Sequence, residues 1–153
     1  MINESDKSLF RNAVEQQKTI DKDSNNKNHP FKNKLNKPFE DYKYLYEPNI
    51  TGSEPVIHFK VGLSPKIIKK MKQGNIDSTP SIDLHGHKIE EACQSLSKFI
   101  HFHSNERFIH IIHGKGYHSN NGLSIIKSQV VHYLKQHPQV LAFCSCPQDM
   151  GGT

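Results

Sequence analysis

Between residues 81 and 146, the spacing of the apolar residues changes four times along the chain. Short apolar stretches typical of strands alternate with longer stretches in which apolar residues recur at helical spacing. The predicted strands lie at 81–86, 107–114 and 139–146, and the predicted helices at 87–103 and 123–138. Because a helix that joins two strands normally makes them parallel, this order predicts an α/β domain of βαβαβ type with parallel pairing.

The first and second predicted strands each end in a polar motif that contains glycine. Asp-Leu-His-Gly occupies residues 83–86, and His-Gly-Lys-Gly occupies residues 113–116. Parallel strands joined by right-handed crossovers have their carboxyl ends at the same edge of the sheet, where open α/β sheets bind ligands. We therefore expect the two motifs to lie side by side.

The second motif has the composition of a phosphate-binding loop, although it lacks the spacing of a Walker loop. Its glycines allow the backbone to approach a ligand closely, and Lys115 supplies a compact positive charge. Free N–H groups at the start of the next helix would add to an anion site. We predict that Lys115 and the backbone of Gly114 and Gly116 hold a phosphate. His113 either protonates a leaving oxygen or is a structural residue at the strand end.

The first motif places a carboxylate and an imidazole two residues apart. Because side chains alternate along a strand, Asp83 and His85 are predicted to face the same way. The carboxylate can then orient the imidazole and stabilise its charged form for general acid–base catalysis. Two other interpretations stay open: the pair shares a divalent metal, or His85 is incidental at a polar strand end. A carboxylate near a phosphate is repulsive unless it serves chemistry or a metal, which favours an enzyme.

Upstream of these motifs the chain is more basic. Residues 1–38 combine the pattern of a short amphipathic helix at 5–17 with a lysine-rich stretch, which is either a solvated linker or an arm that folds onto a partner. Residues 39–80 contain an aromatic stretch, a short extended piece and a helix that starts at Pro65. No acidic residue occurs from 55 to 76, so we predict nucleic-acid contacts from the lysines of this helix, Lys66, Lys69 and Lys70.

Composition narrows the class of protein. Among 153 residues, 20 Lys and Arg face 15 Asp and Glu, and the net charge of +5 suits a polyanionic partner. The three cysteines have the spacing of neither a disulfide framework nor a zinc knuckle, so we expect reduced thiols. No apolar run approaches the roughly 18 residues of a membrane span, and the N-terminus is too polar for a signal peptide. We expect a cytoplasmic protein without a membrane partner.

Together the motifs resemble those of the Smr (small MutS-related) domain family. A third hallmark of that family, Gly-Gly followed by Thr or Ser, appears as residues 151–153, and residues 140–143 look like its Val-x-Ala-Phe strand. The resemblance covers residues 81–153 and extends loosely to flanking segments upstream. Family members usually continue into a closing strand, whereas this sequence stops at Thr153. We expect either that the chain is a truncated one or that the strand at 139–146 has an unpaired edge.

The resemblance implies a two-layer fold of a sheet and two helices, like the C-terminal domain of a translation initiation factor, behind an extended N-terminal arm. It also implies endonuclease activity. Stand-alone members are associated with cleaving mRNA at stalled or collided ribosomes, on which their N-terminal segment docks, and other members nick DNA. Asp83 and His85 are carried over as catalytic, with Gly114, Lys115 and Gly116 at the phosphate, to which we add Gly86 of the first motif.

We therefore predict phosphodiester cleavage, with RNA preferred over DNA and His85 acting as general base or acid beside Asp83. In RNA the 2′-hydroxyl is the nucleophile and no cofactor is required. In DNA a water molecule attacks, and Mg²⁺ or Mn²⁺ held by the same pair becomes more attractive. The alternatives are a DNA-nicking endonuclease and a non-catalytic module that binds nucleic acid or the ribosome.

Overall fold

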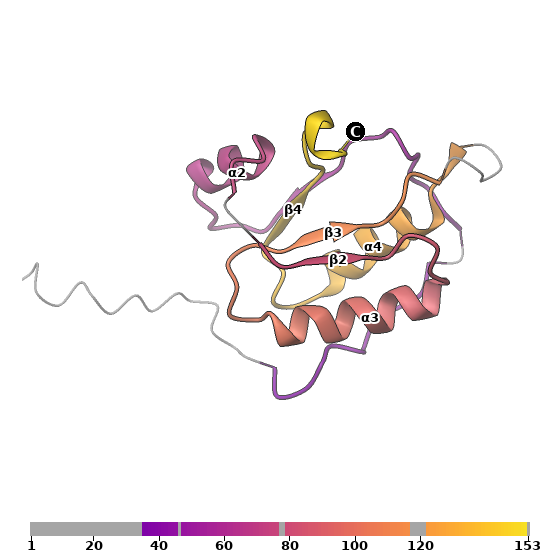
Figure 1. Ribbon diagram of the computed structural model, residues 1–153. Helices are drawn as coiled ribbons and strands as arrows, with labels where there is room; N and C mark the ends of the chain where they lie inside the picture. The colour runs from indigo at the N-terminus through magenta and orange to yellow at the C-terminus, as the bar shows by residue number, and fades with distance from the viewer. Residues whose placement is uncertain (1–34, 46, 77–78, 117–121, 153) are drawn as a thin grey trace, which may run out of the picture. The chain divides into compact units, whose positions relative to one another are not determined.

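The computed structural model describes residues 35–45, 47–76, 79–116 and 122–152. The helix predicted at 5–17, the rest of the arm up to residue 34, and Thr153 lie outside these ranges. Within them the predicted mixed α/β class is confirmed (Figure 1). The elements are β1 (Ile57–Phe59), α2 (Pro65–Lys72), β2 (Ser81–Asp83), α3 (Ile89–Phe102), β3 (His110–Ile112), α4 (Ile125–Gln136), β4 (Ala142–Cys144) and the 3-10 helix η2 (Gln148–Met150). None of the described helices is long and apolar enough to cross a membrane.

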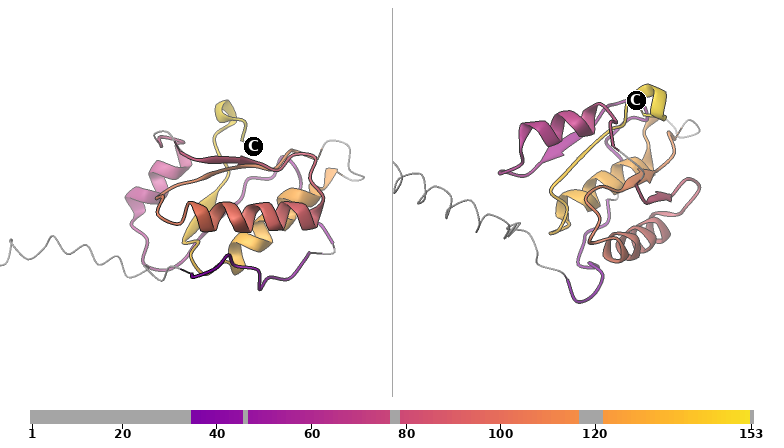
Figure 2. Two further views of the ribbon diagram at one scale, coloured as in Figure 1. Left: turned by 60° about the horizontal axis from the view of Figure 1, so that its bottom comes forward. Right: turned by 60° about the vertical axis from the view of Figure 1, so that its left-hand side comes forward.

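Strands β2 and β3 pair in parallel, as predicted, with Ser81 opposite His110 and Asp83 opposite Ile112. Helices α3 and α4 cover one face of this pair (Figures 1 and 2). The core between the layers consists of Leu84, which directly follows β2, and of buried side chains from both helices: Ala92, Leu96, Ile100, Val130, Tyr133 and Leu134. Both strands run in the same direction and end on the right-hand side of Figure 1, so the two polar motifs follow at the same edge.

Strand β4 does not join β2 and β3, and the prediction of parallel pairing for this strand was wrong. It pairs antiparallel with β1, from Ile57 opposite Cys144 to Phe59 opposite Ala142. The edge that was expected to be unpaired is thus covered by the extended piece upstream. Backbone N–H and C=O groups need partners, but the pattern of a strand does not say which segment supplies them.

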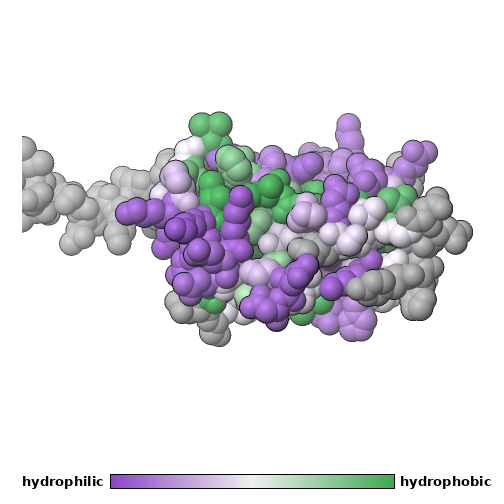
Figure 3. Space-filling view, turned by 90° about the horizontal axis from the view of Figure 1, so that it is seen from above, coloured by the Kyte–Doolittle hydropathy of each residue, from purple (hydrophilic) through white to green (hydrophobic). Residues whose placement is uncertain are grey.

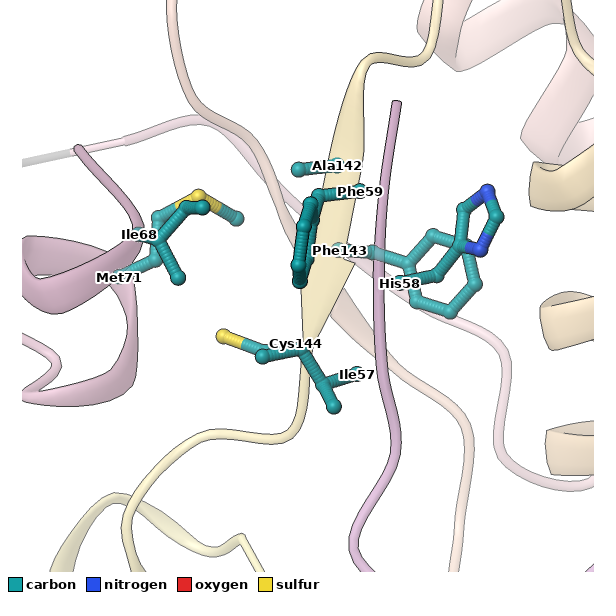
Figure 4. A pocket seen from close by; sticks show the side chains of 8 residues that line it. All are labelled: Ile57, His58, Phe59, Ile68, Met71, Ala142, Phe143 and Cys144. Carbon is teal, nitrogen blue, oxygen red and sulfur yellow. The ribbon is translucent and has the colours of Figure 1, made fainter. Parts of the chain in front are cut away.

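Helix α2 packs on the β1–β4 pair and forms a shallow apolar pocket with it (Figure 4). Along β1 and β4, side chains alternate between the two sides. Ile57, Phe59, Ala142 and Cys144 lie on the side of Ile68 and Met71 of α2, whereas His58 and Phe143 lie on the other side. As predicted, α2 begins at Pro65, and Gly74 follows its end with a φ of 63°.

Residues 39–54 are attached to α3 and α4 by hydrogen bonds between their backbone and side chains of the helices. The hydroxyls of Ser97 and Tyr133 donate to the carbonyl of Phe39 at 2.8 and 3.2 Å. Further along, side chains of α4 accept from backbone N–H groups: Gln136 from Lys43, Gln129 from Leu45, and Ser128 from Asn49 and Ile50. The first part of this segment lies on the side of the helices away from β2 and β3 (Figure 2, left). The helices are therefore covered on both sides.

Residues 39–54 thus form a third layer on the helices. His137, which follows α4, is a buried imidazole that packs against this layer. Its side chain packs edge-on against Phe39, with ring centroids 5.0 Å apart, and only 1% of the residue is exposed. Nδ1 accepts a hydrogen bond from the backbone N–H of Gln139 at 3.2 Å. Burial, with a smaller contribution from the charge of Lys60, lowers the pKa of His137 to about 4. The folded protein therefore holds this ring neutral.

We expect acid to destabilise the fold through His137. Well above pH 6.5 the His137 ring is neutral in both the folded and the unfolded protein. Below pH 6.5 the ring becomes protonated in the unfolded protein, whereas in the folded protein it stays neutral down to about pH 4. The free energy of unfolding should thus fall by about 2 kcal/mol from pH 7.5 to pH 5 through this group. His137→Asn keeps an acceptor near the position of Nδ1 and does not titrate, so its unfolding free energy should be flatter over this range. Unfolding free energies are measured by urea titration at each pH. An equal pH dependence in the two proteins would contradict the assignment.

Candidate active site

The pairing of Asp83 with His85 is the central contact of the first motif. The alternation of side chains continues past the end of β2, so that Leu84 is completely buried and its two neighbours in the sequence lie outside the core. The Asp83 Oδ1 atom lies 2.8 Å from Nδ1 of His85 and also accepts the backbone N–H of the same residue at 3.0 Å. The side chains are 46% and 75% exposed, so solvent reaches both of them. The prediction that they face the same way is confirmed.

These hydrogen bonds fix the ionisation of the carboxyl and the tautomer of the ring. The backbone N–H of His85 is the largest cause, and its imidazole the second, of an Asp83 pKa that lies below the usual range. Asp83 is therefore a carboxylate at neutral pH and accepts the proton on Nδ1. The other ring nitrogen, Nε2, then has the lone pair of the neutral imidazole and is the atom that can take a proton.

The two motifs meet at Gly114. The backbone N–H of Leu84 donates to the carbonyl of Ile112 at 2.7 Å, which extends the β2–β3 pairing toward the second motif. Gly114 has a φ of 73°, and a methyl group placed on it would lie 3.5 Å from the Cβ of His85. The Asp83–His85 pair and the glycine–lysine loop are thus neighbours, as the strand order predicted. Lys115, the next residue, is partly exposed.

The loop also packs against the start of α4. Gly116, with a φ of 66°, lies so close to Ser124 that an added methyl group would stand 3.0 Å from the Cα of that residue. Ser124 is the N-cap of α4, and its hydroxyl accepts the N–H of Lys127 at 3.4 Å and lies 3.4 Å from the carbonyl of Gly114. The helix N-terminus therefore lies directly behind the loop, where its positive dipole end favours an anion.

His113 is held at the strand end by its own backbone. Its Nδ1 donates to the carbonyl of Gly114 at 2.8 Å. Burial lowers the pKa of His113, the positive charge of Lys127 adds to this, and the bond to Gly114 opposes it. A neutral ring with its proton on Nδ1 has none on Nε2 to give to a leaving oxygen. This geometry favours the structural interpretation of His113 over the acid.

The lysines predicted to contact nucleic acid lie elsewhere. Lys66, Lys69 and Lys70 are exposed on α2, which packs against β4 on the left-hand side of Figure 1, whereas the motifs lie at the right. Seen from above, hydrophilic side chains gather on that left-hand side next to hydrophobic surface (Figure 3). The structure thus separates a basic helix from the Asp83–His85 pair.

The described residues do not enclose a metal site. They contain no group of three or more His, Cys, Asp and Glu side chains placed to hold an ion. At the motifs, suitable ligand atoms belong to Asp83, His85 and His113, but Oδ1 of Asp83 is already bonded to Nδ1 of His85 and Nδ1 of His113 to the carbonyl of Gly114. A divalent ion here would depend mainly on oxygen atoms of the substrate and on water, as Mg²⁺ commonly does.

Three residues around the loop had no recognisable signal in the sequence. From the sequence pattern, Ser124 would be an ordinary N-cap, Lys127 a solvated lysine and Gly52 part of a turn. In the structure all three are buried, and each contacts the loop or supports a residue that does. Only the apolar spacing on either side of Lys127 hinted that this face of α4 is covered.

Comparison with known proteins finds the same domain. A model of the Smr domain family matches residues 82–153. "Ribosome rescue factor SmrB" of Buchnera aphidicola subsp. Acyrthosiphon pisum (strain 5A) is 30% identical over 132 residues, covering 82% of this chain and 68% of that protein. The protein of that name from Aliivibrio salmonicida (strain LFI1238) is 28% identical over 164 residues, covering 99% and 89%. The crystal structure of YdaL, a stand-alone small MutS-related protein from Escherichia coli, superposes with a TM-score of 0.57 at 27% identity, covering 67% of this chain and 80% of that one.

Gly116→Ala and Gly86→Ala form a matched pair that tests the packing of the loop. Both glycines have a positive φ, 66° and 75°, so either alanine should cost about 1–2 kcal/mol of backbone strain. Only the alanine at 116 also meets backbone atoms, those of Ser124, because nothing lies within 4 Å of a methyl group at Gly86. We expect Gly116→Ala to lower the free energy of unfolding clearly more, as measured in urea. Equal losses would show that the loop does not rest on α4.

Proposed function

The chain belongs to the Smr domain family, and we propose that it is an endonuclease that cleaves mRNA in ribosome rescue. Two relatives that match most of the chain carry the name "Ribosome rescue factor SmrB", which supports the process. The Asp83–His85 pair beside the glycine–lysine loop supports the chemistry. This juxtaposition is the single observation on which the proposal depends.

A carboxylate at this place argues for catalysis. Binding of backbone phosphates needs positive charge and N–H donors, and Asp83 repels a phosphate that approaches the loop. The ionised carboxylate is nonetheless stabilised because it accepts two hydrogen bonds from His85, one from the backbone N–H and one from the ring. A side chain that orients and polarises an imidazole in this way is what general acid–base catalysis requires.

The cleavage of RNA then follows from the tautomer of His85. Its Nε2 takes the proton of the 2′-hydroxyl, and the 2′-oxygen attacks the adjacent phosphorus. The imidazolium that forms is stabilised by Asp83, as in other carboxylate–histidine pairs. The 5′-oxygen leaves and takes a proton from water, so the products are a 2′,3′-cyclic phosphate and a 5′-hydroxyl. No step uses a metal ion or a proton from His113.

Lys115 and the loop backbone stabilise the charge that develops on the phosphate. The ammonium group pairs with a non-bridging oxygen, and N–H groups of the loop can donate to the same oxygens. Positive φ angles at Gly114 and Gly116 let the backbone curve around Lys115. Behind the loop, the N-terminus of α4 adds a favourable dipole.

A binding module is the second candidate, because the exposed lysines of α2 lie away from the Asp83–His85 pair and would serve binding without cleavage. DNA nicking is the third, and it differs in needing water as the nucleophile. The absence of cleavage therefore distinguishes the second candidate from the first, and the substrate distinguishes the third.

Cleavage of a labelled RNA should separate the three. We expect the wild-type chain to cut RNA in the presence of a chelator, and to leave uncut an oligonucleotide with one 2′-deoxy residue at the scissile position. His85→Ala should lower kcat by about 10²–10⁴-fold with RNA affinity kept, since it removes the base and not the phosphate contacts.

The controls use residues of the same motif and of α2. Asp83→Asn should lower kcat in the same direction, whereas Lys69→Ala should change affinity more than kcat. A His85→Ala protein that binds and cuts as well as wild type would make the chain a binding module or place its chemistry elsewhere. Nicking of supercoiled plasmid that requires Mg²⁺ or Mn²⁺, without RNA cleavage, would favour the DNA enzyme.

We also propose that the basic N-terminal arm docks the protein on the ribosome. Its five lysines between residues 22 and 37 suit ribosomal RNA. Among the residues that the structure describes, the hydrogen bonds to α3 and α4 begin at Phe39, so removal of residues 1–38 leaves these bonds in place. Deletion of these residues should keep cleavage of naked RNA within about twofold and weaken co-sedimentation with ribosomes, more so at low salt. Unchanged co-sedimentation would show that the arm is a tail.

A further inference from the structure

A turn upstream of the matched domain touches the back of the glycine–lysine loop. In this turn the backbone N–H of Glu54 donates to the carbonyl of Thr51 at 3.3 Å. Gly52, at its second position, is buried, and a methyl group placed on it would overlap the carbonyl oxygen of Lys115. No other residue type fits there without moving the Lys115 backbone. The turn therefore limits how close the backbone of Lys115 can come to it.

Lys127 of α4 holds the turn in place. Although it is a lysine, only 1% of it is exposed. Its ammonium donates to three carbonyl oxygens of the turn, those of Thr51 at 3.2 Å, Gly52 at 3.0 Å and Glu54 at 2.5 Å. All three protons are thus committed to backbone oxygens of one turn, and none is left for a phosphate.

The turn is also tied to the start of α4, which supports the loop from another side. The N–H of Gly52 donates to the carbonyl of Gly122 at 3.2 Å, and the N–H of Ser124 to that of Ile50 at 2.8 Å. Ser124 in turn packs against Gly116. The turn, the N-cap and the loop therefore form one hydrogen-bonded and closely packed unit.

We propose that Gly52, clamped by Lys127, is a positioning residue that sets where Lys115 presents its ammonium and backbone to the scissile phosphate. The inference rests on the proposed function, because it assigns Lys115 to the phosphate. It adds a determinant that lies 30 residues before the matched domain, which begins at residue 82. Neither residue contacts the substrate, since one faces the rear of the loop and the other is buried.

Gly52→Ala in the full chain is the direct test, because it adds one methyl group against the carbonyl of Lys115. The φ of Gly52 is not in the left-handed region, so alanine brings crowding without backbone strain. A displacement of the loop of about 1 Å should lower kcat about 10–100-fold and leave KM for RNA within about threefold. The amide resonances of Gly114 and Gly116 should shift in an ¹H–¹⁵N spectrum.

Two further variants control for folding and location. Ser53→Ala alters an exposed residue of the same turn and should match wild type in kcat and in both amide resonances. Lys127→Met keeps a long buried stem but removes the three bonds to the turn, so it should shift the same two amides without any added methyl group. A purely structural role would lower the melting temperature without changing kcat below it.

The outcomes separate this inference from the proposed function. Shifted amides with reduced kcat support both. Shifted amides in a chain that does not cut RNA even as wild type support the positioning and reject the endonuclease. Unshifted amides and an unchanged kcat in a folded Gly52→Ala protein overturn the positioning, whatever the activity of wild type. If Gly52→Ala does not fold, unshifted amides in Lys127→Met overturn it as well.

Discussion

The parallel pairing of β2 with β3 brings the two motifs of the candidate site to the same edge of the sheet. Its register sets Asp83 opposite Ile112, and one further bond, from Leu84 to the carbonyl of Ile112, carries it to the end of both strands. A slip of one residue would turn Asp83 and His85 into the core and Leu84 out to solvent. Because Leu84 is fully buried beneath α3 and α4, such a slip would cost much of its hydrophobic burial. The register of the site is therefore fixed by an apolar residue that takes no part in its chemistry.

Most of this arrangement could be predicted because it rests on local periodicity and chain order. Apolar spacing predicted both ends of α3 and α4 to within two residues, and the crossover rule correctly placed residues 83–86 beside residues 113–116. The pairing of β4 with β1 could not be predicted in this way. The two strands are separated by more than 80 residues, and neither the Ile-His-Phe of β1 nor the Ala-Phe-Cys of β4 indicates whether the partner is parallel or antiparallel.

The third layer escaped prediction for a different reason. Lys127, Ser128 and Gln129 look like the wet face of an amphipathic helix, yet each is 1% exposed. They are buried because residues 39–54 cover them with backbone groups, and each polar side chain bonds to that backbone. Burial of a polar group is tolerated when it is hydrogen-bonded, so hydropathy alone cannot tell a solvated face from one covered by main chain.

The glycines of the second motif are restrained by neighbouring residues. Gly114 and Gly116 let the backbone curve around Lys115, but glycine has little preference for one conformation and loses much entropy when it is fixed. A loop built on them needs neighbours to hold it. His85 lies beside Gly114 and Ser124 beside Gly116, and these two contacts arise within residues 82–153. The carbonyl of Lys115 has its neighbour in Gly52, outside that range. The carbonyl of Lys115, the central residue of the loop, is thus packed against a part of the chain that the two motifs do not include. In the endonuclease that we propose, this packing would keep Lys115 from presenting its charge over a range of positions, whereas the scissile phosphate requires one.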